Sequence, residues 1–477
     1  MLVKHSFLYA LARGIPGLVN FAALAVYTRL LSPDEYGQYA LVIAVVGFLN
    51  MVLFEWLHLG LLRYLASAAE SKPVFLSTII AGFIALALIV SLSGAVFYVC
   101  YPQTGLRELI LPGLVLLFFT GLFNLNLQLK TAQLLPLQFG QLSAGKSVFG
   151  LMFGATLVWF GYGPRGILLA LALAMGLSLL LWARREWRDT RLALFDKSLM
   201  RRLMGYGLPL AANLAMAEVI SSSDRMFLVW MHDEATTGLY AVGYDFASHV
   251  LGVLLMIINL AAYPLAVRAL EQQGKAAAVQ QLRKNVILLS GVAVPAAIGL
   301  AVLAPGISRL FLGEAFRQAA QAIIPWVALA ALLAGLKAYY FDLAFQLGQH
   351  TLGQLYVLGA AALINLLLNR LLIPDLAVMG AIYATLAAYC IGLLLSVVIG
   401  RRWFKLPFPA IELLKITAAG AMMGVAVWPW RDEPGPMSLA MTILLGAAVY
   451  CLLLALFNTG GLRDNLINIT KQRRQHD

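Results

Sequence analysis

The sequence predicts an all-α integral membrane protein with about fourteen transmembrane helices. Hydrophobic residues make up 61% of the 477 residues and charged residues only 12%, whereas a soluble globular domain carries about 25% charged residues. Uninterrupted apolar stretches of about 20 residues, enough to cross a hydrocarbon core of about 30 Å, recur along nearly the whole chain. Such continuous runs favour helices rather than the alternating strands of a β-barrel.

Each apolar stretch is predicted as one helix. The ranges are about 6–30, 37–62, 75–99, 107–129, 138–161, 165–184, 204–230, 238–263, 286–312, 320–345, 352–373, 377–400, 411–430 and 437–457. The longest connections, about 185–203 and 264–285, are too short to hold a soluble catalytic domain. We therefore expect a protein that is not an enzyme, with no catalytic residue and no cofactor.

Lysine and arginine concentrate in alternate loops of this arrangement. The largest groups are Arg184 to Arg202, Arg268 to Lys284, and the tail from Arg463 onward. Because cytoplasmic loops carry an excess of these residues, both termini are predicted to be cytoplasmic. The net charge of +12 is then a feature of topology and of contact with anionic lipid headgroups, and no nucleic-acid partner is expected.

An internal repeat relates two parts of the chain. Gly37, Tyr39 and Ala40 align with Gly238, Tyr240 and Ala241 at an offset of 201 residues, and both copies follow an acidic, turn-forming loop. Since about six helices separate the copies, the repeats have the same orientation in the membrane. The predicted divisions are an N-terminal lobe 1–186, a basic cytoplasmic linker 187–203, a C-terminal lobe 204–402, and two last helices with a basic cytoplasmic tail in 403–477.

Four cations interrupt apolar stretches: Arg13, Lys146, Arg225 and Lys337. A charge at the bilayer centre costs about 2.5–3.5 kcal/mol, so these side chains are expected to face a protein interior. Arg13, Lys146 and Lys337 each lie about two turns from the cytoplasmic end of a helix, which predicts a shared anion site. Snorkelling to the headgroups or a local ion pair is the alternative for each residue.

Other polar residues within the apolar stretches are candidates for ion coupling or for lining a cavity. These candidates are Glu55, Glu218, Asp245 and Asn20. Glu218 shares one helix face with Ser221, Ser222 and Arg225, and hydrogen bonding between helices is the simpler explanation for such a face. Glu55 and His58 form a single Glu-x-x-His pair, whereas a di-iron site needs two such pairs and further carboxylates, so no metal site is expected.

One segment of the chain matches a nucleotide-binding sequence pattern. Residues 140–147, GQLSAGKS, fit the phosphate-loop pattern G-x-x-x-x-G-K-[ST]. That pattern binds nucleotides where a buried strand delivers the loop to a helix N-terminus in an α/β domain. Here it opens an apolar helix with no strand nearby, so we interpret it as a coincidence.

Several segments resemble the polysaccharide transporter family, which includes Wzx-type flippases within the multidrug/oligosaccharidyl-lipid/polysaccharide (MOP) exporter superfamily. They are RLLSPDEYGQYAL (29–41), GLLRYLA (60–66), GYGLPLAANLAMAEVISSSDRMFL (205–228), TGLYAVGYDFAS (237–248) and INLLLNRLLIPDLAVMGAIYATLAAY (364–389). The resemblance implies a V-shaped transporter of two parallel six-helix repeats plus two C-terminal helices. It carries over no catalytic residue; Arg225 in its Asp-Arg context is the one family-like position.

The function implied by the resemblance is that of a flippase for undecaprenyl-pyrophosphate-linked oligosaccharide, an O-antigen (lipopolysaccharide) or exopolysaccharide repeat unit, in the bacterial inner membrane. H⁺ or Na⁺ would be the coupling ion, and a polysaccharide polymerase and a chain-length regulator would be partners. The alternatives are a drug/cation antiporter of the same superfamily and a membrane polyprenyl-sugar glycosyltransferase or polymerase. Arg13 in the first helix favours an anionic cargo over a cationic drug.

Overall fold

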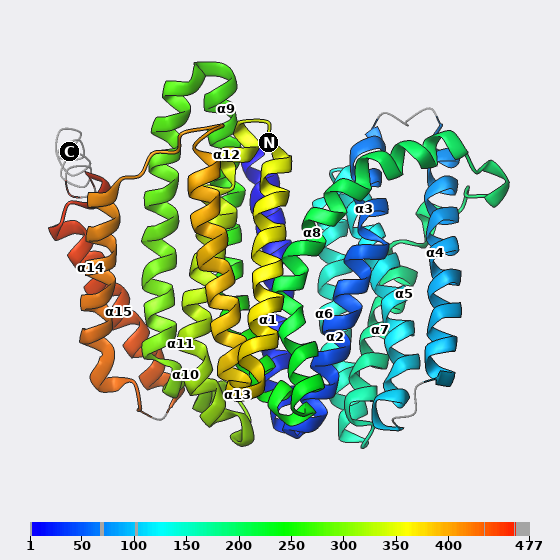
Figure 1. Cartoon of the computed structure of the whole chain (residues 1–477), viewed down its shortest axis with the longest axis horizontal. Coiled ribbons are helices and arrows are strands. Elements are labelled where there is room, and N and C mark those ends of the chain that lie inside the picture. The colour runs from blue at the N-terminus through cyan, green and yellow to red at the C-terminus, as the bar shows by residue number, and fades with distance from the viewer. Residues whose placement is uncertain (1, 67–70, 101–103, 434, 462, 464–477) are drawn as a thin grey trace, which may run out of the picture. The chain divides into compact units, whose positions relative to one another are not determined.

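The computed structural model describes residues 2–66, 71–100, 104–433, 435–461 and 463 (Figure 1). Within these ranges the chain forms helices and short connections, without a strand. Eleven described helices are long and apolar enough to cross a membrane. The prediction of an all-α membrane protein is therefore confirmed.

Two of the eleven helices are too long for a single crossing, which takes about 20 residues. Helix α9 (Glu234–Val302) has 69 residues and α13 (Thr351–Gly400) has 50, and each is broken by a residue with non-helical backbone angles, Gly274 and Ala377. Figure 1 shows α9 as two helical segments joined at one end. Counting the two parts of each helix separately gives thirteen described segments among the candidate spans. Helix α1 (Leu2–Leu30), with 29 residues, is a further long helix and brings the number to the fourteen that the sequence predicts.

The chain divides into two compact units, Met1–Ala241 with Ala362–Ala381 and Val242–Ala361 with Ile382–Asp477. These units are defined by which residues pack together, whereas the predicted lobes are defined by the internal sequence repeat. The lobe boundaries therefore stay a prediction.

The first unit holds the helices before α9. They are α1, α2 (Pro33–Leu53), α3 (Glu55–Tyr64), α4 (Lys72–Cys100), α5 (Thr104–Ala132), α6 (Pro136–Trp159), α7 (Gly163–Trp182) and α8 (Lys197–Met231). Helix α2 starts with a capping box, in which Ser32 and Glu35 each accept a hydrogen bond from the other's backbone N–H. Phe54, Phe75 and Phe123 are fully buried in the apolar core of this unit.

Ion pairs with Glu186 connect three segments at one end of the first unit. Glu186, between α7 and α8, lies 2.7 Å from the ammonium of Lys130 and 3.5 Å from that of Lys72. Burial alone would raise the pKa of the Glu186 carboxyl, but hydrogen bonds from Lys130 and Gln133 and the charges of Lys130 and Lys72 hold it below its usual range. The start of α4, the end of α5 and the segment after α7 therefore meet at the same end of this unit.

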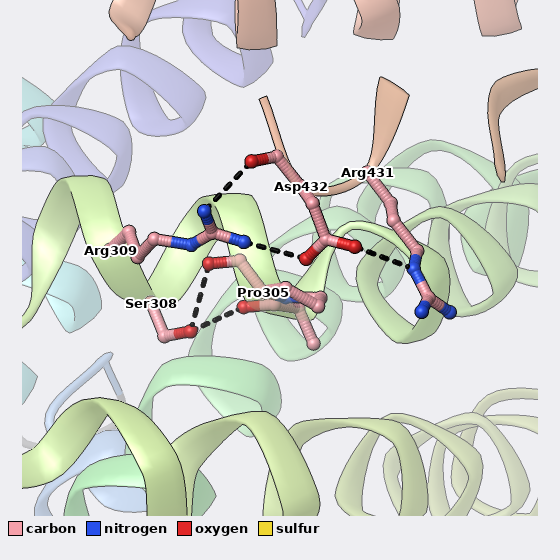
Figure 2. A network of polar contacts seen from close by, with 6 residues as sticks. Pro305, Ser308, Arg309, Arg431 and Asp432 are labelled. Atoms are coloured by element: carbon pink, nitrogen blue, oxygen red, sulfur yellow. Dashed lines mark hydrogen bonds and ion pairs between the residues drawn. The ribbon is translucent and has the colours of Figure 1, made fainter. Parts of the chain in front are cut away.

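The second unit holds most of α9 and the helices that follow it. They are α10 (Ala304–Phe311), α11 (Glu314–Leu336), the π-helical segment η4 (Lys337–Phe341), α12 (Leu343–Leu347), most of α13, α14 (Ala410–Val427) and α15 (Pro436–Leu456). Arg309 of α10 and Arg431 both reach the carboxylate of Asp432, at 2.6 and 3.0 Å (Figure 2). This contact joins α10 to the connection between α14 and α15.

The two copies of the repeat meet through their equivalent glycines. A Cβ atom at Gly37 would overlap the carbonyl oxygen of Glu234, and one at Gly238 would overlap that of Pro33. Both pairs are related by the same offset of 201 residues, so the contact is reciprocal. Glycine is required at both positions because any side chain would collide with the backbone of the other copy.

Candidate functional site

Lys146 lies on α6 within an apolar span and is half-buried. Its ammonium nitrogen is 5.6 Å from the centre of the Phe123 ring on α5, a favourable cation–π distance. No carboxylate forms an ion pair with Lys146 among the described residues. Its charge is therefore available to an anionic ligand.

Lys337 has a different environment, in the π-helical segment of the second unit. It is 4% exposed, and its ammonium lies 2.8 Å from the carboxylate of Asp342. The other oxygen of Asp342 accepts a hydrogen bond of 2.6 Å from Ser396 on α13. The ion pair is thus buried and further hydrogen-bonded, which is the arrangement that a buried charge needs. π-Helical turns are frequent at functional sites.

The side chain of Arg13 lies outside the described part of the chain. Lys146 belongs to the first unit and Lys337 to the second, and their convergence on one anion stays a prediction. The local ion pair that sequence reasoning left open for Lys337 is present, whereas Lys146 has no such pair within the described residues.

Arg225 on α8 is 7% exposed and follows Asp224, which is fully buried. The carboxylate of Asp224 accepts hydrogen bonds from the Tyr240 hydroxyl at 2.5 Å and from the Asn369 amide at 2.7 Å. The Asn365 amide oxygen accepts a hydrogen bond from Ser223 at 2.9 Å. Asp224 is therefore held by side chains from α9 and α13.

The remaining candidates differ in burial. Glu218 accepts a hydrogen bond from Ser222 one turn along α8, and a Cβ at Gly47 of α2 would lie 3.3 Å from the Glu218 carboxylate. Asp245 on α9 is half-buried, and Asn20 on α1 is exposed. Of these three side chains, Glu218 lies at a described helix–helix contact.

Glu55 and His58 form a buried pair at the start of α3. The Nδ1 atom of His58 is 2.9 Å from a carboxylate oxygen of Glu55, and Nε2 is 3.0 Å from the carbonyl oxygen of Gly121 on α5. The His58 side chain is 1% exposed and that of Glu55 is 12% exposed. No group of three or more potential metal ligands occurs among the residues that the structure describes.

The phosphate-loop match is explained by helix packing. Residues 140–147 lie inside the continuous helix α6. A Cβ at Gly145 would lie 3.0 Å from the Ser178 hydroxyl and would collide with the ring of Trp182 on α7. Gly145 therefore allows α6 and α7 to approach closely.

A family model described as polysaccharide biosynthesis protein matches residues 26–321. The chain belongs to this family. A comparison with curated proteins finds no match.

Members of the MOP superfamily share the fold of this polysaccharide biosynthesis protein. Lipid II flippase MurJ in an inward closed conformation superposes with a TM-score of 0.79 at 15% identity, over 96% of this chain and 100% of that one. A multidrug resistance MATE family transporter in an inward-facing conformation has a TM-score of 0.58 at 15% identity, over 83% and 97%. A MOP superfamily transporter from Pyrococcus furiosus has 0.55 at 15%, over 84% and 95%. The fold is that of transporters.

Sequence reasoning missed several residues of the hydrogen-bond networks around the embedded charges in this family member. Asn365 and Asn369 stand four residues apart inside an apolar stretch, a spacing that places two amides on one helix face and could have marked them. Ser396 is a single hydroxyl in an apolar helix and carries no such signal. The buried network of Asp224 joins three of the segments that carry the family resemblance, 205–228, 237–248 and 364–389.

Proposed function

We propose that this protein moves an undecaprenyl-pyrophosphate-linked oligosaccharide, an O-antigen or exopolysaccharide repeat unit, from the inner to the outer leaflet of the bacterial inner membrane. Movement occurs by alternating access and is coupled to H⁺ or Na⁺. Membership of a polysaccharide biosynthesis family and a fold shared with a lipid II flippase support the proposal. A polymerase and a chain-length regulator are the proposed partners.

The observation that carries the proposal is that Lys146, inside a membrane span, has no carboxylate partner among the described residues. An ammonium group inside a membrane span is costly unless a protein group or ligand compensates its charge. Phe123 supplies a weak cation–π contact, and the described residues offer Lys146 no carboxylate. A diphosphate would provide the missing negative charge, and a cationic drug would not.

In the proposed cycle, Arg13, Lys146 and Lys337 hold the pyrophosphate while the glycan occupies a polar cavity and the lipid tail stays in the bilayer. Glu218, Asp245 and Asn20 are proposed to line the cavity. The lobes 1–186 and 204–402 rock about the cavity, and Arg225 receives the phosphate on the outer side. Both termini lie in the cytoplasm; the shared contacts of Lys72 and Lys130 with Glu186 support placing these basic loops on one face.

The test uses proteoliposomes that contain a polyprenyl-pyrophosphate-linked oligosaccharide, with outer-leaflet glycan measured by its susceptibility to an added glycosidase. Wild type is expected to transfer the glycan, and Lys146→Met to lose at least about tenfold in rate, the equivalent of about 1.4 kcal/mol. Lys275→Met is the matched control, because Lys275 lies 5.4 Å from the centre of the Phe404 ring but is exposed. Equal rates for Lys146→Met and wild type would contradict the proposal.

A drug/cation antiporter is the second candidate, because MATE transporters share the fold. The same vesicles distinguish it when they are loaded with a fluorescent organic cation. Export of the cation, with no movement of the glycan, would favour the antiporter.

A further inference from the structure

We propose that Glu55 and His58 form the site at which this transporter binds and releases its coupling proton. The coupling role of the proton rests on the proposed function. The proton-binding site itself rests on the distances between His58, Glu55 and Gly121. It selects H⁺ over Na⁺ and assigns the ion to two residues of the first unit.

The acceptor on the far side of His58 determines the protonation of its ring. The Gly121 carbonyl oxygen, 3.0 Å from Nε2, can only accept, so Nε2 carries a proton. The Nδ1 atom then lies 2.9 Å from a carboxylate oxygen of Glu55. A hydrogen bond between these two atoms needs one further proton, located on either of them.

The proton held between Nδ1 and the carboxylate makes the pair neutral overall. It is either an imidazolium beside a carboxylate or an imidazole beside a carboxylic acid. When this proton leaves, imidazole keeps the proton on Nε2, the carboxylate keeps its negative charge, and the pair changes from neutral to a charge of −1. Two acceptors then face each other at hydrogen-bonding distance, an arrangement that cannot persist without movement.

No other described group competes for this proton. Helix α3 packs against α2, α4, α5 and α8. The titratable residues on these helices and on α3 itself are Asp34, Glu35, Tyr36, Tyr39, Arg63, Tyr64, Lys72, Tyr98, Cys100, Arg107, Glu108, Lys130, Lys197, Arg201, Arg202, Tyr206, Glu218, Asp224 and Arg225. None of them forms a described hydrogen bond or ion pair with Glu55 or His58.

The pair is placed to exchange a proton and to transmit the change. The side chain of Glu55 keeps 12% of its surface exposed while that of His58 keeps 1%, so protons reach the pair through Glu55. The pair lies where α2 ends and α3 begins, at Phe54. Gly207 of α8 packs directly on the carbonyl of Trp56, between the two residues, and a Cβ there would overlap it. A change of charge at the pair therefore acts on the contact between α3 and α8.

The first experiment counts protons and needs no cargo. Purified full-length protein in nanodiscs is titrated between pH about 5 and 8, the interval in which histidine side chains in general change charge, with a pH-indicator dye. Wild type is expected to take up about one proton per molecule more than the double variant Glu55→Gln/His58→Gln. Asn126→Leu, which removes a buried amide of α5 that accepts from Trp187, is expected to match wild type. Equal uptake by wild type and the double variant overturns the proposal.

A measurement on wild type alone covers the case in which the double variant fails to fold. With ¹⁵N-labelled histidine, the Nε2 signal of His58 is expected to stay that of a protonated nitrogen while the environment of Nδ1 changes with pH. A pH-independent Nδ1 signal overturns the proposal.

The coupling role has its own test. In proteoliposomes, an imposed pH difference is expected to change the rate of glycan transfer by wild type. For Glu55→Gln, this change in rate is expected to be at least about tenfold smaller. A retained response overturns the coupling role. If no protein moves the glycan, the proposed function fails, and the proton count still decides whether the site exists.

Discussion

Gly37 of α2 and Gly238 of α9 pack on each other's helix in a reciprocal contact: each lies against the backbone carbonyl of the residue four positions before the other, Glu234 for Gly37 and Pro33 for Gly238. The same offset of 201 residues relates the glycines and the carbonyls. The sequence repeat is thus also a point of helix–helix packing.

Gly37→Ala is expected to destabilise the protein by about 1–3 kcal/mol or more, because the new methyl group would overlap a backbone atom that cannot rotate away. Thermal unfolding in detergent, followed by size-exclusion chromatography, measures the effect. Gly359→Ala is the control: a Cβ there meets nothing within 4 Å, and alanine favours the helix by up to about 1 kcal/mol. Equal melting temperatures for the two variants would show that the contact is not tight.

Asn369→Leu is expected to cost about 1–3 kcal/mol, because it removes one of the donors to the buried carboxylate of Asp224. Tyr240→Phe removes another donor and should cost a similar amount. Thermal unfolding of both single variants and of the double variant measures the coupling. Asn20→Leu, at an exposed position, is expected to lie within about 0.5 kcal/mol of wild type. Strictly additive losses would mean that the two donors act independently.

Asp342→Asn is expected to lower the free energy of unfolding by about 3–5 kcal/mol, because it leaves the Lys337 ammonium buried without its counter-charge. Lys337→Met with Asp342→Leu replaces the pair by apolar side chains and should restore most of this stability. Glycan transfer by the double variant then tests the predicted role of Lys337. A stable double variant that transfers glycan at the wild-type rate would mean that Lys337 is only structural.

Acidification is expected to weaken the contacts of Glu186. The pKa of this carboxyl is lower in the folded protein than its usual value, which is about 4.3 in an unfolded chain. The group therefore contributes stability above about pH 4.3, and this contribution is lost as the pH falls through the folded-state pKa. Glu186→Gln should be less stable than wild type at pH 7, with the difference vanishing in strong acid.

Melting temperatures across the pH range measure this prediction for Glu186. Glu271→Gln, at an exposed position of α9, is the control and should track wild type at every pH. A Glu186→Gln variant with the melting temperature of wild type at pH 7 would show that the ionic contacts with Lys72 and Lys130 contribute nothing measurable.

The fold was largely predictable because the bilayer imposes a length and a composition on each helix. The breaks at Gly274 and Ala377 agree with the predicted separation of helices within α9 and α13. The candidate site was less predictable. Lys146 and Lys337 look alike in the sequence, yet only Lys337 has a described carboxylate partner, Asp342. That difference depends on which side chains neighbouring helices bring within a few ångströms.

The sequence by itself determined the membrane-spanning class, the helix count, the repeat at 201 residues and the family, since these follow from hydropathy and from the order of residues along the chain. Only the tertiary structure decided that His58 lies within hydrogen-bonding distance of both Glu55 and the Gly121 carbonyl and that Gly37 and Gly238 pack on each other's helix. Hydrogen bonds and close backbone contacts between helices depend on the rotation and separation of each helix. Residue order alone does not specify those quantities.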